Sequence, residues 1–194
     1  RPLTADSMIE LMADLFTELY DVPDGRMGQL ISNAVANAPL SAVRDAYPVL
    51  VFDPGFSVAP RHYSLFLETL ASQGYVVFAA SHPYVTTLTV YPDGRTVEAV
   101  SEGALRAAWG VRAYFDAEFQ DMWVPDIEFV LDQIDGLNQD DPQGMFAGRL
   151  DTSAFGFIGH SMGARTLTEV CLFDDRCAGV INLALNGTIM LSAM

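Results

Sequence analysis

The chain has 194 residues, of which 51% are hydrophobic, and a formal net charge of −15 from 25 acidic and 10 basic residues. This length and apolar content suit a single domain with a sizeable core and exclude an intrinsically disordered chain. Every basic residue is an arginine, and so acidic a chain argues against nucleic acid and anionic membranes as partners. No apolar run approaches the ~20 residues needed to cross a bilayer.

The first 45 residues are expected to form a helical N-terminal extension that packs on the core. Apolar residues recur at helical spacing from Met8 to Leu19, after a capping box at residues 7–10. A second, weaker helix is expected over residues 27–38, where Pro39 stops it. Neither helix carries a chemical motif, and no domain boundary is evident, so residues 1–194 are interpreted as one domain.

From residue 48 onward, short apolar runs alternate with helical patterns. The run over residues 48–52 is continuously apolar, as buried parallel strands are. The expected elements, in order, are a strand at 48–52, a helix at 63–74, a buried strand at 75–80, hairpin strands at 88–91 and 96–100, helices at 101–119 and 124–137, a loop at 138–148, and strands at 154–158 and 179–185. This order predicts an α/β fold with a mostly parallel sheet and helices on both faces.

Residues 159–163, Gly-His-Ser-Met-Gly, have the form G-x-S-x-G. An apolar strand precedes them and a helical pattern follows from Ala164, which is the context that a nucleophile elbow requires. Such a turn strains the backbone of the serine, and a Cβ at Gly159 or Gly163 would crowd the neighbouring strand or helix. The pattern favours Ser161 as a catalytic nucleophile. The alternative is a serine in an ordinary turn that caps the helix.

The histidines do not complete a triad in the expected order. A nucleophile elbow is followed along the chain by the acid and then the histidine. All three histidines, His62, His82 and His160, precede Ser161, and the side chain of His160 should leave the turn in another direction. A serine without a base is a poor nucleophile, so the chain is a fragment, one chain of a two-chain protein, or an inactive relative. His62, His82 and Asp53 lack metal-ligand spacing, and neither metal nor cofactor is expected.

Cys171 and Cys177 lie close together in the sequence, at the end of the elbow helix and before the next strand. Sequence spacing cannot fix the distance between their Cα atoms, so a local disulfide and two buried thiols are both compatible with it. The chain opens with Arg1-Pro2 rather than methionine, which fits a processed protein. A secreted or periplasmic location is expected.

Six segments, in the same order along the chain, then resemble one family: Phe52-Asp53-Pro54-Gly55-Phe56, Leu70-Ala71-Ser72-Gln73-Gly74-Tyr75-Val76-Val77, Ser81-His82-Pro83-Tyr84, Tyr91-Pro92-Asp93-Gly94-Arg95, Phe129-Val130-Leu131-Asp132-Gln133-Ile134 and Ala147-Gly148-Arg149-Leu150-Asp151. They are similar to the platelet-activating-factor acetylhydrolase branch of the α/β-hydrolases, from about Tyr47 onward. The resemblance implies an α/β-hydrolase fold whose C-terminal strands are missing from this chain. It also implies ester hydrolysis through an acyl-serine, with short-acyl phospholipids as one substrate class.

The resemblance also assigns roles around Ser161. It implies an oxyanion hole made by the backbone amides of Phe56 and Met162. The family usually has His-Gly where this chain has Pro54-Gly55, but a backbone donor does not depend on that side chain. The family's acid lies in a segment like Asn-Leu-Asp-Gly, which is Ala184-Leu185-Asn186-Gly187 here, so Asn186 stands at the acid position. The family's histidine would lie beyond residue 194.

The first hypothesis is a serine esterase acting on short-acyl (phospho)lipids or related small esters. A second chain or a C-terminal segment would supply the histidine and complete the sheet, whose edge after the last strand would otherwise be unpaired. Asn186 would then be a natural variant, an engineered inactivation, or an Asn-Gly site that deamidates. Asp174 or Asp175 could replace the acid, but they are more simply part of a turn. A pocket lined by Phe56, Tyr84 and Trp109 would favour apolar acyl groups.

The second hypothesis is a catalytically inactive, hydrolase-like interaction module. It explains Asn186 and the missing histidine together. It does not explain why Ser161 keeps an intact elbow.

Overall fold

The computed structural model describes residues 32, 34–100, 118–183 and 189–192. The chain divides into two compact units, Arg1–Val35 with Val90–Thr96, and Ala36–Thr89 with Val97–Met194. The second unit contains the main sheet and the elbow. No helix among the described residues combines the length and the apolar character that a membrane span requires.

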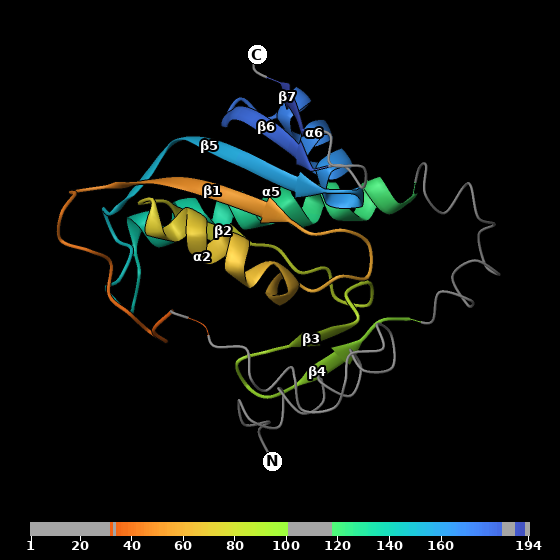
Figure 1. The fold of residues 1–194 in the computed structure, drawn as a ribbon, viewed down its shortest axis with the longest axis horizontal. Coiled ribbons are helices and arrows are strands. Elements are labelled where there is room, and N and C mark those ends of the chain that lie inside the picture. Colours follow the sequence, from red (N-terminus) through yellow and green to blue (C-terminus); the bar gives the residue numbers. More distant parts are fainter. Residues whose placement is uncertain (1–31, 33, 101–117, 184–188, 193–194) are drawn as a thin grey trace. The chain divides into compact units, whose positions relative to one another are not determined.

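The second unit is built on a five-stranded sheet with the order β2-β1-β5-β6-β7 (Figure 1). Its four parallel strands are those that the sequence predicts, and their bounds are Tyr47–Asp53 for β1, Val76–Ala79 for β2, Leu150–His160 for β5 and Cys177–Leu183 for β6. The fifth strand, β7 (Ile189–Ser192), runs antiparallel to β6. The prediction of an unpaired sheet edge beyond β6 is therefore wrong, because β7 pairs with β6 from Val180 to Leu183.

Helices cover both faces of this sheet, as predicted (Figure 1). A 3₁₀ turn, η2 (Pro60–Tyr63), leads into α2 (Ser64–Ser72) on one face, and α5 (Glu118–Gln139) and α6 (Met162–Phe173) lie on the other. Successive side chains of β1 point to opposite faces. Val49 and Val51 join the core beneath α5 and α6, whereas the Phe52 ring lies 6.1 Å from the ring of Phe66 on α2. Burial on both faces explains why β1 is continuously apolar.

The predicted hairpin is also present. It consists of β3 (Leu88–Val90) and β4 (Thr96–Glu98), which form a separate two-stranded sheet. The N–H of Tyr91 donates to the carbonyl of Arg95 at 2.8 Å, and Gly94 has a φ of 83°, a conformation that glycine adopts without strain. The guanidinium of Arg95 pairs with Asp93 and lies 4.6 Å from the centre of the Tyr91 ring.

Three expectations about individual elements need correction. The helix expected at residues 124–137 begins by Glu118 and continues through Pro125. The strand expected at residues 75–80 is half-buried rather than buried, because β2 is an edge strand. The helix expected at residues 27–38 is absent over residues 34–38, where Asn37 has a left-handed φ of 57° and Ala38 precedes a proline, which disfavours helical backbone.

Other expectations lie outside the described residues. These are the helix at residues 8–19 and all but the last two residues of the helix at 101–119. Residues 34–46, the described part of the N-terminal extension, form turns, bends and irregular backbone.

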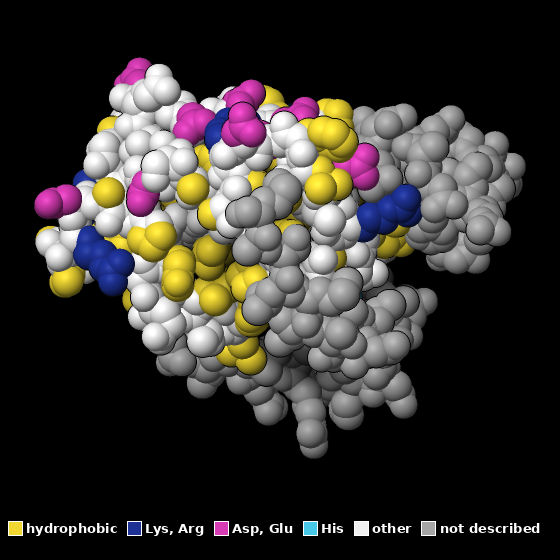
Figure 2. Space-filling model, turned by 90° about the horizontal axis from the view of Figure 1, so that it is seen from above, with side chains coloured by type: hydrophobic (Ala, Val, Ile, Leu, Met, Phe, Trp, Pro, Cys, Tyr) yellow, Lys and Arg dark blue, Asp and Glu magenta, His cyan; other side chains and the backbone are white. Residues whose placement is uncertain are grey.

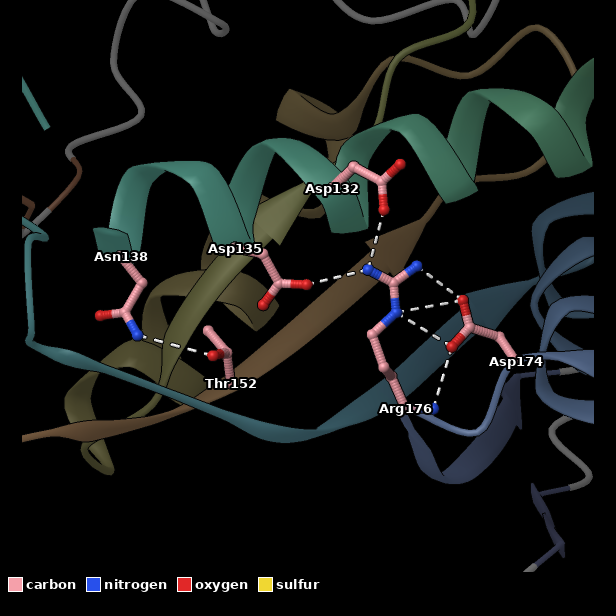
Figure 3. A network of polar contacts seen from close by, with 6 residues as sticks. All are labelled: Asp132, Asp135, Asn138, Thr152, Asp174 and Arg176. Carbon is pink, nitrogen blue, oxygen red and sulfur yellow. Dashed lines mark hydrogen bonds and ion pairs between the residues drawn. The ribbon is translucent and has the colours of Figure 1, made fainter. Parts of the chain in front are cut away.

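Two links fix the turn between α6 and β6. A disulfide joins Cys171 to Cys177, which decides between the two alternatives left by their spacing. Arg176 makes ion pairs with three carboxylates, Asp174 in the same turn and Asp132 and Asp135 on α5, and Figure 3 shows its guanidinium between them. The surface in Figure 2 shows hydrophobic side chains gathered near its middle, with acidic side chains and separate arginines around them.

Candidate active site

Ser161 occupies the turn between β5, which ends at His160, and α6, which begins at Met162. Its φ of 53° and ψ of −113° are sparsely populated by residues other than glycine, as expected of a strained elbow. The N–H of Ser161 donates to the carbonyl of Leu183 at 3.2 Å. Its side chain makes no capping hydrogen bond to α6, which argues against the alternative of a simple helix cap.

The glycines around Ser161 are required by close backbone contacts. A Cβ on Gly159 would overlap the backbone of Ala164 in α6, and a Cβ on Gly163 would overlap the carbonyl groups of Asp53 and Pro54. The elbow therefore packs directly against both its own helix and the end of β1. These are the crowded positions that the G-x-S-x-G pattern predicts.

The loop after β1 lies against the elbow. A Cβ on Gly55 would stand 2.8 Å from Nδ1 of His160 and 3.5 Å from Cβ of Ser161. Phe56, the next residue, packs against the same apolar cluster that contains Met162. The two residues whose amides are predicted to form the oxyanion hole thus share one neighbourhood. That role of their amides remains a prediction.

His160 turns away from the nucleophile, as its place in the elbow predicts. Its Nδ1 lies 2.7 Å from the hydroxyl of Tyr63, and the N–H of Gly55 donates to the same hydroxyl at 3.4 Å. Tyr63 thereby links the loop after β1 to the end of β5. Partial burial lowers the pKa of His160, which keeps the imidazole neutral at pH 7.

The other two histidines are also engaged elsewhere. Nδ1 of His62 accepts a hydrogen bond from the N–H of Ala59 at 3.2 Å, and burial, together with nearby Arg61, lowers its pKa. Both ring nitrogens of His82 contact carboxylates, Asp53 at 2.9 Å and Asp126 at 2.8 Å. A histidine clamped on both sides has no lone pair with which to accept a proton from a serine.

The clamp around His82 is a feature that the sequence reasoning missed. Asp53 ends β1, His82 follows β2, and Asp126 and Trp123 lie on α5. The ring of Trp123 stacks on that of His82 with centroids 3.8 Å apart and planes 12° apart. The carboxyl ends of adjacent parallel strands meet at one edge of a sheet. Pairing the predicted strands 48–52 and 75–80 would therefore have placed Asp53 near His82.

The remaining predicted residues have varied positions. Asn186 and Trp109 lie outside the described residues. Asp174 pairs with Arg176, which lowers the pKa of its carboxyl, so it serves the turn after α6 and not a triad. Tyr84 has a left-handed φ of 69° and a largely exposed side chain. Among the described residues, no His, Cys, Asp and Glu side chains are grouped so that they could hold a metal ion.

Comparisons with known proteins agree with this architecture. Residues 22–98 match the family model described as platelet-activating factor acetylhydrolase, isoform II. A probable 1-alkyl-2-acetylglycerophosphocholine esterase from Arthroderma benhamiae is 26% identical over 142 residues, which cover 70% of this chain and 30% of that protein. A ferulic acid esterase from Streptomyces cinnamoneus superposes with a TM-score of 0.59 at 25% identity, over 86% of this chain and 43% of that one.

The chain thus spans about a third of the length of the first relative and less than half of the second. The family match ends before the elbow, whereas the structural match covers most of the chain. The strand order, the strained serine between β5 and α6 and these likenesses agree with the resemblance drawn from the sequence. The chain is similar to platelet-activating factor acetylhydrolases and has an α/β-hydrolase fold.

Proposed function

We propose that the protein is a serine carboxylic-ester hydrolase in which Ser161 is the nucleophile. Its hydroxyl oxygen attacks the ester carbonyl, the alcohol leaves, and water then releases the acid from the acyl-serine. The amides of Phe56 and Met162 would hold the negative oxygen of each tetrahedral intermediate. The observation that carries the proposal is the strained backbone of Ser161, in a turn packed against the loop after β1.

The general base would come from outside residues 1–194. The sequence has three histidines, and the contacts of each one support a role other than that of the general base. His82 lies between two carboxylates, His160 contacts Tyr63, and His62 contacts the backbone of Ala59. A C-terminal segment or a second chain would therefore supply the histidine, beside an acid position that Asn186 occupies here.

Short-acyl esters are the proposed substrates. The Arthroderma relative is named for an ester of acetate on a glycerophospholipid, and the Streptomyces enzyme for an ester of a small aromatic acid. Both names describe carboxylic esters with a compact acyl group, which is the class proposed for this chain. A secreted or periplasmic location is also proposed, and the Cys171–Cys177 disulfide supports it because such bonds persist in oxidising compartments.

The test is Ser161→Ala in the full-length protein, assayed with p-nitrophenyl acetate. Loss of the nucleophile should lower turnover by at least about 10³-fold, a modest share of what such losses cost other serine hydrolases. Ser153→Ala is the matched control, because Ser153 lies on the same strand and its hydroxyl donates to nearby Asp151. Unchanged turnover in Ser161→Ala would reject the nucleophile. A wild-type protein without activity would favour the inactive module.

A further inference from the structure

A buried charged group lies beside the candidate oxyanion hole, and the proposed reaction does not use it directly. Asp53 and His82 are almost completely buried, whereas half of the Asp126 side chain is exposed. Nε2 of His82 is 2.9 Å from Oδ1 of Asp53, and Nδ1 is 2.8 Å from Oδ2 of Asp126. Burying a charged pair is costly unless its geometry is well satisfied, so a group of this kind needs a reason.

The clamp connects to both residues of the candidate oxyanion hole. Trp123 stacks on His82 and belongs to the apolar cluster that contains Met162, against which Phe56 packs. Asp53 lies three residues before Phe56, and the backbone carbonyl of Asp53 would overlap a Cβ added to Gly163. The clamp is therefore linked to the loop after β1 through the backbone that follows Asp53. It is linked to the first turn of α6 through the indole of Trp123.

We propose that His82, held between Asp53 and Asp126, is a positioning residue that fixes the oxyanion hole through Trp123. This inference rests on the proposed function, because it assigns a task to the amides of Phe56 and Met162. Oxyanion-hole donors stabilise a transition state only when they are aimed in advance at the developing charge. An indole that stacks on the clamped imidazole and belongs to the apolar cluster of Met162, against which Phe56 packs, would limit the movement of these two residues.

The protonation state of His82 follows from its partners. Burial raises the pKa of the Asp53 carboxyl, against the lowering effect of its hydrogen bond to His82. When both carboxylates are ionised they only accept hydrogen bonds, so both ring nitrogens carry a hydrogen and the ring is an imidazolium. Burial lowers the pKa of His82, but the hydrogen bonds to Asp126 and Asp53 outweigh it and raise the pKa to about 9. Among the described residues, the ionisable groups that face His82 are Asp53 from β1 and Asp126 from α5.

The clamp should therefore open on the alkaline side. Below about pH 9 the imidazolium donates to both carboxylates. Above that pH one nitrogen loses its hydrogen, and a lone pair then faces a carboxylate. The raised pKa means that the positioning is present at neutral pH and is lost as the pH rises.

The test compares kcat and KM from pH 6 to 10 in the full-length wild-type protein and its Asp126→Asn and Asp132→Asn variants. Asp126→Asn keeps the shape of the side chain and an acceptor oxygen but removes its negative charge, which should lower the pKa of His82. The alkaline fall in kcat should therefore shift to lower pH by about one unit or more. KM should change little. Asp132→Asn is the matched control, because it makes the same change on α5 at an exposed carboxylate that pairs with Arg176. It should behave as wild type.

A second measurement reports the state of His82 directly. In a Trp109→Phe background, Trp123 is the remaining tryptophan of residues 1–194, and the emission of a Trp109→Phe/Trp123→Phe variant is subtracted to isolate its signal. A stacked imidazolium quenches indole fluorescence, so emission should rise with the same midpoint as the fall in kcat, and both midpoints should shift together in Asp126→Asn. His82→Gln should also lower kcat about tenfold with KM little changed, because donors displaced slightly lose much of their effect.

The outcomes separate this inference from the proposed function. If Asp126→Asn shifts the fluorescence midpoint but not the kcat profile, His82 titrates without positioning the site and the inference is rejected. The inference is also rejected if neither midpoint shifts. If wild type shows no turnover beyond that of Ser161→Ala, the proposed function fails and this inference fails with it.

Discussion

At the residue scale, the site depends on three glycines that let backbones meet. Gly159 allows β5 to contact α6, Gly163 allows α6 to contact the end of β1, and Gly55 allows the next loop to contact Ser161. Because the atoms in the way are mostly backbone, they cannot move aside as flexible side chains can. The strained conformation of Ser161 is held by these contacts.

Gly163→Ala should lower the free energy of unfolding by about 1 to 3 kcal/mol, as overpacking in a tight interior does, and should abolish ester turnover. Gly136→Ala is the matched control, because a Cβ at this position on α5 would meet nothing within 4 Å. It should raise the free energy of unfolding by about 1 kcal/mol, since alanine is the better helix former, and leave turnover unchanged. Urea unfolding of both variants measures this. Equal effects would contradict the account of the elbow.

Asn186 provides a second residue-scale prediction, which follows from the family resemblance. An amide at the acid position cannot stabilise an imidazolium and favours the wrong histidine tautomer. In the full-length protein, Asn186→Asp should raise ester turnover by at least ~10²-fold, a conservative share of that penalty. Intact-mass spectra of fresh and aged samples would show whether the Asn186-Gly187 pair deamidates and imitates the variant. An unchanged rate would mean that Asn186 is only a turn residue.

At the element scale, Arg176 joins the turn before β6 to α5. Its guanidinium contacts Asp132 and Asp135 at 2.9 Å each and Asp174 at 2.7 Å (Figure 3). These partners raise its pKa further above the ordinary arginine value. This link thus ties the C-terminal half of α5 to the turn before β6.

Arg176→Gln should therefore lower the free energy of unfolding by about 1 kcal/mol, the upper range for partly exposed ion pairs, with a smaller loss at high salt. Arg95→Gln is the control, because that ion pair joins residues only two apart in one exposed turn. Thermal unfolding at low and high salt measures both. A loss that did not depend on salt would show that Arg176 acts through packing of its stem rather than through its charge.

The helices, strands and turns were largely predictable where the pattern of neighbouring residues determines them. The apolar run of β1, the glycine-rich elbow and the Pro92–Arg95 hairpin turn each follow from nearby residues. Pro125 misled the prediction because proline normally marks the start of a helix, whereas here buried Trp123 and Ile127 hold α5 together on both sides of it. The pairing of β7 with β6 depends on contacts that no local pattern contains.

At the scale of the whole molecule, the candidate site forms where parallel strands end. Ser161 follows β5, Phe56 follows β1 and His82 follows β2, so residues more than a hundred positions apart come together. This is where open α/β sheets place their ligands. The sequence predicted the nucleophile and its loop because each carries a local motif. It did not predict the Asp53–His82–Asp126 clamp, because that requires knowing which strands pair.

Covalent labelling is the sharpest test of Ser161 as the nucleophile of an ester hydrolase. The full-length protein is treated with a fluorophosphonate probe, digested, and analysed by mass spectrometry, with Ser161→Ala and Ser153→Ala in parallel. We expect a single phosphonylated peptide that contains Ser161, present in wild type and Ser153→Ala and absent from Ser161→Ala. Labelling at another serine, or none in a protein that hydrolyses esters, would contradict this assignment.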